Sequence, residues 1–540
     1  MGEEQTEETQ GTVELPTTVA AALHQKPKPP KVVASVIFFV NPNSGGLKGA
    51  LLLKELQAAA QMVELEEDRA VKITAFDISF WASTTTTPPW TALQEALQVK
   101  CDEEGGATMV PSVVIAAGGD GTFNWTMEIL RNPQLRQNGL VHWPSRFAPL
   151  PLGTGNELAN VMGWKTFLDN QASKNCCSCI TRSGRKSKKL IIPDLKEYLR
   201  ELLENEVVAL DEWQVIEQSA STSKTTVHPM LCFVSVGMDA QIAYQCAQIR
   251  DEKAKWRSST VLMIKANHAW YGFKKILSPH DSIAQRVELE VQFDEEDNDN
   301  NNNDNENPNR QEELTPVDIP KSLQNVQIFN IASGADGIDF WGGQQPSQPH
   351  EFSPNHPHAP SPNDGKLEVC GLKNIFPHMA AIKLQLTHAH RLGQTASAQI
   401  KVLRKVPVQV DGEPWMLQEG DTLVIRPRPR GALEDASTEV HVVQGPEQTG
   451  LLCMAPKKSI QGQSAVERPP PSASRKKIQQ FASACKHWSL HAKNTLLLGS
   501  KHRKQEGDTE WNPHSEPMLP TTTTDNTRGS LFHRTRSDFC

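Results

Sequence analysis

The sequence lacks both the long apolar runs of a membrane-spanning protein and the apolar leader of a secreted one. No stretch of its 540 residues approaches the length of about 18 consecutive apolar residues that a membrane helix needs. The first residues are acidic and have no apolar core, which argues against a signal peptide. Both absences lead us to expect a cytoplasmic protein.

A zinc framework is also missing. Cys176, Cys177 and Cys179 form the densest group of cysteines, but no His or Cys group lies at zinc-finger spacing from them. The plain interpretation is free thiols in a reducing compartment. A palmitoylated or metal-binding cluster is the alternative.

The formal net charge of -8 comes largely from one segment. Residues 294–313 hold nine acidic residues and one arginine, so the rest of the chain is close to neutral. An acidic tract rich in asparagine cannot bury a core, which predicts a solvated insertion there. Residues 445–540 are basic and rich in proline, serine and threonine, which predicts a disordered tail.

The two common nucleotide-binding motifs are absent as well. Three glycine-rich turns are present, at residues 41–46, 118–122 and 153–156, and none of them reads as a P-loop or as a Rossmann G-x-G-x-x-G. Each turn follows an apolar run. An apolar run that ends in glycines and leads into a helix places bare backbone N–H groups against phosphates.

Asp120 stands between two glycines of the second turn. A carboxylate beside phosphates is repulsive unless a cation lies between them, and Mg²⁺ is the usual mediator. The three turns together therefore indicate a nucleoside triphosphate and a metal ion. Asp120 could instead stabilise its own turn. In the third turn, Thr154 or Asn156 could be an ordinary helix cap, and both roles can hold at once.

From residue 32 to about residue 165, strand-like runs alternate with helical stretches, one of them at residues 49–67. That alternation predicts a parallel sheet covered by helices. Residues 166–205 look like an insertion with a basic stretch at 182–189. Such a stretch is typical of a solvated loop, and an anionic-membrane contact or a nuclear signal is the alternative.

Beyond residue 207, short alternating runs predict a largely antiparallel β domain. The expected strands are residues 212–217, 230–236, 286–293, 325–331, 381–386, 398–403 and 422–425, with a helical exception at 240–276. Residues 475–504 place apolar side chains, Trp488 among them, on one helical face between basic residues. This pattern is typical of an amphipathic helix at a membrane surface or a calmodulin-type element. A solvated tail with accidental periodicity is the alternative.

The three turns, taken with segments of the second half, resemble the catalytic and accessory domains of eukaryotic diacylglycerol kinases. The matching later segments are residues 210–213, 233–240, 330–334, 340–342, 363–369 and 409–415. The resemblance implies an α/β N-terminal domain with a parallel sheet, like that of NAD kinases and phosphofructokinases, and then a mostly antiparallel β-sandwich. The expected boundaries are a disordered N-terminus at 1–31, a catalytic domain at 32–165, the insertion at 166–205, an accessory domain at 206–430 and the tail at 445–540.

The family implies a kinase that uses ATP and Mg²⁺ to phosphorylate the free hydroxyl of diacylglycerol, giving phosphatidate. By resemblance, Asp120 acts at the metal and the γ-phosphate, and Asp411 and Glu413 are the candidates for the base on the lipid hydroxyl. Asp211 and Asp239 match acidic positions that organise the domain interface or a second metal. The residues implied to hold the nucleotide are Asn41, Pro42, Ser44, Gly45, Gly46, Gly118, Gly119, Gly121, Thr122, Gly153, Thr154, Gly155 and Asn156.

The sequence departs from the family in two respects. Glu157 stands where the family usually has aspartate, and neither the zinc-bearing diacylglycerol-binding modules nor EF-hand loops are found. Membrane contact must then come from elsewhere, with residues 475–504 as the candidate. The expected partners are diacylglycerol and a membrane surface that the protein binds peripherally. No nucleic-acid partner is expected.

Two other functions stay open. A sphingoid-base or ceramide kinase shares the glycine turns, although residues 330–333 and 411–415 favour diacylglycerol. The second alternative is an inactive lipid-binding scaffold. The presence of Asp120, Asp411 and Glu413 argues against it.

Overall fold

In the computed structural model, the described residues run from 31 to 446, without residues 60, 67–68, 83–86, 104–105, 137–142, 154, 179–189, 253–281, 293–313, 332, 335–336, 341–359, 374, 385 and 430–439. The expected acidic insertion, the basic stretch and the amphipathic helix lie outside the described residues. The chain divides into two compact units between Leu210 and Asp211, and residues 440–446 return to the first unit.

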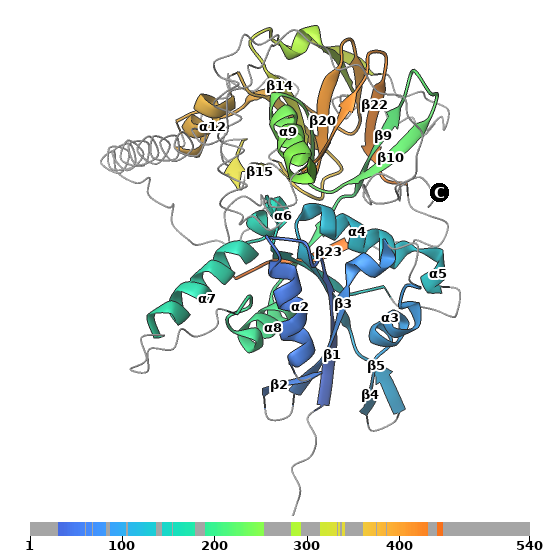
Figure 1. The fold of residues 1–540 in the computed structure, drawn as a ribbon, viewed down its shortest axis with the longest axis vertical. Coiled ribbons are helices and arrows are strands. Elements are labelled where there is room, and N and C mark those ends of the chain that lie inside the picture. Colours follow the sequence, from blue (N-terminus) through green and yellow to red (C-terminus); the bar gives the residue numbers. More distant parts are fainter. Residues whose placement is uncertain are drawn as a thin grey trace, which may run out of the picture. The chain divides into compact units, whose positions relative to one another are not determined.

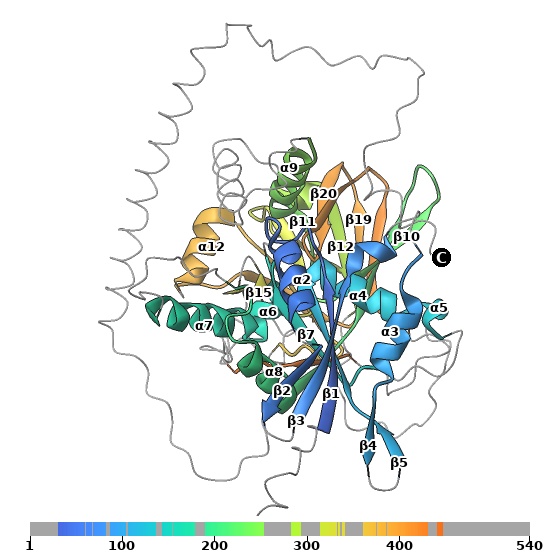
Figure 2. The same cartoon turned by 60° about the horizontal axis from the view of Figure 1, so that its bottom comes forward.

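The first unit is built on a parallel sheet whose central strands are buried on both faces. Within the described residues its strand order is β2 (Met62–Glu66), β3 (Arg69–Asp77), β1 (Lys31–Val40), β6 (Ser112–Gly118), β7 (Arg146–Pro151), β23 (Val440–Val443) and β8 (Val207–Leu210). The pairs from β3 through β23 are parallel, and β2 and β8 pair antiparallel at the edges. The predicted parallel sheet is confirmed, and Figure 2 shows its strands β1, β2 and β3 side by side.

Helices cover this sheet, as the alternation of runs predicts. α2 (Lys48–Ala58) packs against β1 and β3, α3 (Trp90–Leu97) against β1, α4 (Asp120–Arg131) against β6, and α6 (Glu157–Val161) and α7 (Trp164–Ser178) against β7 (Figure 1). The remaining elements of the unit are η1 (Ile78–Trp81), α5 (Pro133–Arg136), α8 (Leu195–Glu204) and the hairpin β4 (Lys100–Glu103) and β5 (Gly106–Met109).

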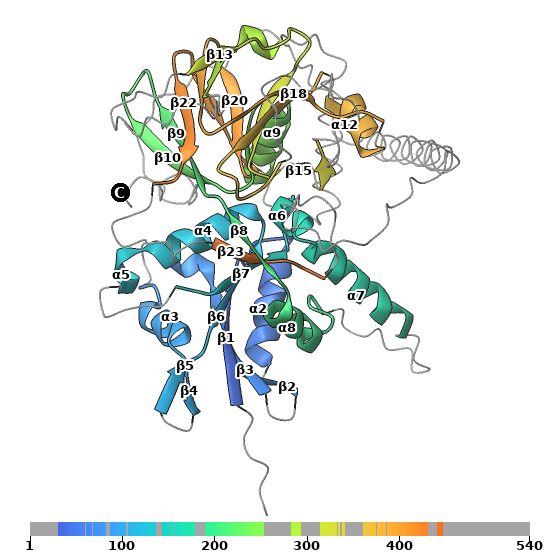
Figure 3. The same cartoon turned by 180° about the vertical axis from the view of Figure 1, so that it is seen from behind.

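Two features of the first unit differ from the sequence-based expectation. The helix expected at residues 49–67 ends at Ala58, because Met62–Glu66 pairs with β3 as a strand. Parts of the expected insertion at 166–205 belong to the core of the unit. The Trp164 ring lies 5.1 Å from that of Tyr198 on α8, and its indole N–H donates to the Val443 carbonyl on β23. Figure 3 shows β23 and β8 next to β7.

The second unit is a β-sandwich. Within the described residues one sheet has the order β10 (Thr225–Met230), β9 (Trp213–Gln218), β22 (Thr422–Pro427), β19 (Ala398–Val402), β12 (Val287–Val291) and β13 (Thr315–Val317). The other has the order β18 (His390–Thr395), β17 (Leu367–Gly371), β14 (Asn325–Phe329), β11 (Phe233–Gly237), β20 (Val406–Val410) and β21 (Glu413–Leu417). All pairs are antiparallel, and one apolar core joins the two inner faces. The predicted antiparallel sandwich is confirmed.

One expected strand of this unit is wrong. Residues 381–386 alternate apolar and polar side chains, but residues 381–383 are the end of α12 (Ile375–Lys383). The buried side chains of Ile375 and Ile382, about two helical turns apart, hold this helix in place. The predicted helix at 240–276 is seen as α9 (Met238–Glu252), and the rest of it lies outside the described residues. α9 packs against β11, β20 and β21 (Figure 1). The elements η2 (Ile283–Gln285), β15 (Ser333–Gly334) and β16 (Ile338–Asp339) complete the unit.

Candidate active site

The three glycine-rich turns meet at one edge of the first sheet. They follow β1, β6 and β7, which are adjacent parallel strands, so their carboxyl ends lie side by side. The Asn41 N–H donates to the Ala117 carbonyl at 3.0 Å, and the N–H groups of Leu152 and Gly153 both donate to the Gly118 carbonyl at 2.9 Å. Open α/β sheets bind ligands at this edge.

Two of the glycines are required by close approach of the turns. Gly153 lies against Gly119, and a Cβ on Gly153 would come within 2.6 Å of the Gly119 Cα. Gly45 has a φ of +62°, and a Cβ there would come within 2.3 Å of the Leu152 carbonyl oxygen. The glycines therefore bring three stretches of backbone into direct contact. This leaves a surface formed largely by peptide groups, which suits phosphate binding.

Asp120 joins the second and third turns. It is the first residue of α4, and its carboxylate accepts hydrogen bonds from the N–H groups of Glu157 at 2.9 Å and Leu158 at 3.1 Å, at the start of α6. Asp120 thus has a structural role, but these bonds join it to the third turn, whereas the alternative was that it stabilises its own turn. A carboxylate is also the type of side chain that binds Mg²⁺ in proteins. The positive end of α4 also lies at this residue.

Three other predicted nucleotide-binding residues lie in the same place. The Asn41 side-chain N–H donates to the Thr122 hydroxyl at 3.3 Å, which ties the first turn to the second. Asn156 has left-handed backbone conformation with a φ of 58°, and its side-chain N–H donates to the Gly153 carbonyl at 2.8 Å. Thr154 lies outside the described residues.

The Asn156 Oδ1 atom provides a test of whether a nucleotide and its metal fit here. This oxygen is buried and has no hydrogen-bond partner within the described residues. Phosphate oxygens are acceptors and cannot satisfy it, but a ribose hydroxyl or a metal-bound water can donate to it. An orphaned acceptor between glycine turns therefore fits a hydrated Mg²⁺–nucleotide complex.

Asp411 and Glu413 lie at the turn of the β20–β21 hairpin in the second unit. Asp411 is in the turn, and Glu413 is the first residue of β21. Asp411 and Gly412 have φ values of 46° and 83°, the left-handed pair of a type I′ turn. The Asp411 carboxylate is buried and accepts three backbone N–H groups, from Leu231 at 2.8 Å and from Cys232 and Phe233 at 2.9 Å. These bonds give Asp411 a structural role. Glu413, by contrast, is exposed.

Asp239 is also enclosed by donors. Its carboxylate accepts from the Ser235 hydroxyl and from the side-chain amides of Asn325 at 2.8 Å and of Gln327 and Gln409 at 3.0 Å. Neutral donors on β11, β14 and β20 thus hold the anion and fix the start of α9 to the sheet. This arrangement explains Asp239 without a metal.

Asp211 lies beside a second carboxylate. Its Oδ2 atom accepts the Gly365 N–H at 2.7 Å, and burial together with the nearby Asp211 charge raises the pKa of Asp364 to about 6. Within the described ranges, no group of three or more His, Cys, Asp or Glu side chains is placed to hold a metal ion. The predicted metal role of Asp211 and Asp239 stays a prediction.

Glu368 is an unusual residue that no sequence motif singles out. It is fully buried on β17, its Oε1 atom accepts from the Gln394 amide at 3.2 Å, and its Oε2 atom has no partner among the described residues. Burial, followed by the charge of Asp364, raises the pKa of Glu368 well above its ordinary value. Strand alternation predicts that Glu368 lies on the other face of the sheet from Leu367 and Val369. It does not predict that this second face is buried as well.

We expect Glu368→Gln to stabilise the protein at alkaline pH. The folded state holds the proton on Glu368 to a higher pH than the unfolded state does, so rising pH favours unfolding of the wild type. Glutamine cannot ionise. The gain in free energy of unfolding at pH 8 should be on the order of 1.4 kcal/mol for each unit of pKa elevation, and it should vanish as the pH falls to the unfolded value. Urea unfolding at several pH values measures it.

Glu290→Gln is the matched control for this prediction. Glu290 also lies on a strand, but it is only partly buried and pairs with Lys401 at 2.7 Å. Its replacement should lower the stability slightly or leave it unchanged at every pH. Equal pH dependence of Glu368→Gln and the wild type would show that Glu368 is ionised in the folded protein.

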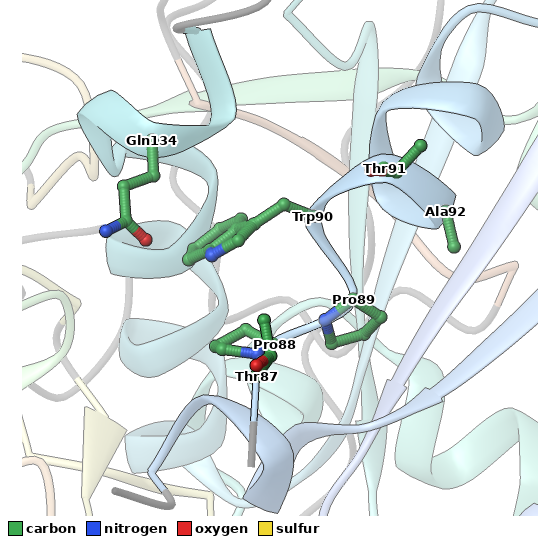
Figure 4. Close-up of a pocket in the computed structure, with 7 residues that line it drawn as sticks. All are labelled: Thr87, Pro88, Pro89, Trp90, Thr91, Ala92 and Gln134. Carbon is green, nitrogen blue, oxygen red and sulfur yellow. The ribbon is translucent and has the colours of Figure 1, made fainter.

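The hollow in Figure 4 is a separate feature of the first unit. It lies at the start of α3 and is lined by Pro88, Pro89, Trp90 and Gln134, among others. None of the predicted site residues lines it. The candidate active site is therefore defined by the glycine turns.

Two stretches of the chain match models of known domains. Residues 35–191 match the diacylglycerol kinase catalytic domain, and residues 229–414 match the diacylglycerol kinase accessory domain. The first match contains the three glycine turns, and the second contains most of the sandwich. The chain thus combines the catalytic and the accessory domain of diacylglycerol kinases. It belongs to the diacylglycerol kinase family.

Individual relatives agree with this assignment. The chain is 25% identical over 418 residues to diacylglycerol kinase theta of Homo sapiens, covering 76% of this chain and 35% of the relative. It is 23% identical over 423 residues to diacylglycerol kinase 7 of Arabidopsis thaliana, covering 71% of this chain and 76% of the relative. The chain thus spans about a third of the length of the human relative.

Solved structures with a similar course of the chain include a diacylglycerol kinase from Bacillus anthracis, with 13% identity, a TM-score of 0.32, and coverage of 76% of this chain and 97% of that one. Yeast NADH kinase complexed with NADH has 12% identity, a TM-score of 0.30, and coverage of 78% of this chain and 85% of that one.

Proposed function

We propose that this protein is a lipid kinase that transfers the γ-phosphoryl group of ATP to the free hydroxyl of diacylglycerol. The observation that carries the proposal is the meeting of three glycine turns and Asp120 at one sheet edge, in a chain with both domains of the family. Phosphoryl transfer needs positioned phosphates and neutralised charge more than covalent chemistry. A backbone surface with the Asp120 carboxylate at its centre supplies such a site.

Each group has a defined task in this proposal. The turns after β1, β6 and β7 and the first-turn amides of α4 bind the phosphates, and Asp120 with Asn156 would hold a hydrated Mg²⁺. When bound, that ion neutralises charge on the phosphates. The lipid oxygen forms a bond to the γ-phosphorus as the bond to the ADP oxygen breaks. Its proton passes to a carboxylate, for which exposed Glu413 is our candidate, and Asp411 holds the turn that presents it.

A panel of lipids tests this function. The purified protein is incubated with labelled ATP and Mg²⁺, with diacylglycerol, ceramide or sphingosine in mixed micelles. We expect label in phosphatidate. Label in ceramide phosphate or sphingosine phosphate alone would establish the alternative kinase. Lipid binding without any phosphoryl transfer would support the alternative of an inactive lipid-binding scaffold.

We further propose that the protein reaches its substrate as a peripheral membrane protein. None of the helices that the structure describes is long and apolar enough to cross a bilayer. Deleting the residues beyond 470, which contain the amphipathic pattern at 475–504, should weaken binding to anionic vesicles and leave turnover of a micellar substrate intact. If the truncated protein sediments with anionic vesicles like the wild type, the residues beyond 470 do not mediate membrane binding.

A further inference from the structure

Helix α12 and the segment after it carry exposed basic and apolar side chains. We define the α12 patch as Lys373, His378, Lys383, Leu386, His388 and His390. The two lysines are exposed, and the three histidines are half-buried. Leu386 is 60% exposed, more than any other large apolar side chain among the described residues.

The helix beneath the patch is firmly held. Ile375 and Ile382 are each 3% exposed and anchor α12, and the His378 ring meets the His388 carbonyl at 2.9 Å. The segment from His388 leads into β18, whose pairing with β17 fixes His390. Figure 3 shows α12 beside β15 and β18 in the second unit. Lys383 lies at the end of this anchored helix, and the Leu386 N–H donates to the Ala381 carbonyl at 3.0 Å, which ties the exposed leucine to the helix.

The basic groups act on one another. Burial lowers the pKa of His378 and of His390, and the positive charge of Lys373 and the neighbouring imidazoles lowers both further. Both rings are thus held toward their neutral form, so the exposed Lys373 and Lys383 supply the positive charge of the patch. Two exposed cations favour an anionic partner.

We propose that the α12 patch binds the surface of an anionic lipid bilayer. Basic residues around an exposed leucine match the two attractions of a bilayer surface, phosphate charge at the headgroups and apolar contact just below them. The proposal rests on the proposed function for its rationale, because diacylglycerol resides in a bilayer. It does not depend on turnover for its test.

Sedimentation with vesicles tests the patch in the full-length protein. The vesicles contain phosphatidylcholine and phosphatidylserine in equal amounts, or phosphatidylcholine alone. Lys373→Gln with Lys383→Gln should reduce partition onto the anionic vesicles about 25-fold, since each lysine at such a surface contributes about fivefold. Leu386→Ser should reduce it about tenfold through lost apolar burial. Added salt should reduce the difference between the wild type and the lysine variant, because salt screens the charges, and it should leave the effect of Leu386→Ser unchanged.

Matched controls come from the same unit. Leu403 is 40% exposed and lies two residues before the exposed Lys405 in the β19–β20 turn. Leu403→Ser, and Lys405→Gln with Lys224→Gln, should sediment like the wild type. Equal losses in these controls, wild-type binding of the α12 variants, or failure of the wild type to bind anionic vesicles would each overturn the proposal.

The activity of the same variants separates this proposal from the proposed function. Because the patch lies outside the glycine turns, its variants should phosphorylate a micellar short-chain diacylglycerol at the wild-type rate. If the variants bind vesicles normally and phosphatidate still forms, only the patch fails. If the patch variants lose vesicle binding and the wild type never forms phosphatidate, only the kinase function fails.

Discussion

Asp120→Ala should abolish phosphatidate formation in a protein that remains folded. The substitution removes the carboxylate that joins the second and third turns, and with it the group that would hold the cation between protein and phosphates. Loss of a preorganised electrostatic group of this kind lowers turnover by about 10²–10³-fold or more. The rate is measured with diacylglycerol and Mg-ATP, and ATP affinity is measured separately with and without Mg²⁺.

Asp194→Ala is the matched control for Asp120→Ala. Asp194 also caps a helix, accepting the Glu197 N–H at 3.0 Å at the start of α8, but it has no part in the glycine turns. Both substitutions should lower the free energy of unfolding by about 1 kcal/mol through the lost cap. Only Asp120→Ala should lose activity. Wild-type turnover in Asp120→Ala would remove our central assignment, and a collapse of its melting temperature would assign Asp120 to folding.

The catalytic unit is more predictable from sequence than the accessory unit. Its central strands are largely apolar runs, and glycines at their ends mark turns that lie side by side in a parallel sheet. The sequence does not predict that Val440–Val443 extends that sheet beside β7. A short strand far along the chain has no local pattern that indicates which strand it pairs with. The strand predicted at residues 381–386 is wrong for a related reason. A short alternation of apolar and polar residues fits a strand, but burial of Ile375 and Ile382 stabilises a helix instead.

The candidate site shows a different limit. Motif segments single out Asp239, Asn330 and Asp411, and the structure places each of them in a hydrogen-bonded anchor. Asn330 is fully buried and receives the Trp213 indole N–H, while its own amide donates to the Asp211 and Leu231 carbonyls. A catalytic carboxylate and an anchoring one require the same residue type. Only the count of donors around the side chain separates them, and that count is a property of the fold.

The same distinction leads to a large expected effect on stability. Asp411→Ala should lower the free energy of unfolding by about 3–5 kcal/mol, because it leaves three buried backbone N–H groups without their acceptor. Alanine is also disfavoured at the positive φ of this position. Chemical denaturation measures the change.

Two further variants separate an anchoring role of Asp411 from a catalytic one. Asp411→Asn keeps an acceptor for the Cys232 and Phe233 N–H groups and tolerates the left-handed backbone, so it should be less destabilising than Asp411→Ala and remain active below its melting temperature. Glu413→Gln, at an exposed position, should change stability by no more than about 0.5 kcal/mol. It should nevertheless lower turnover by about 10²–10⁴-fold if it is the base. Two results together would identify Asp411, and not Glu413, as the base: wild-type stability of Asp411→Ala and loss of activity in Asp411→Asn. The first would show that the fold does not need the Asp411 carboxylate, and the second that the reaction does.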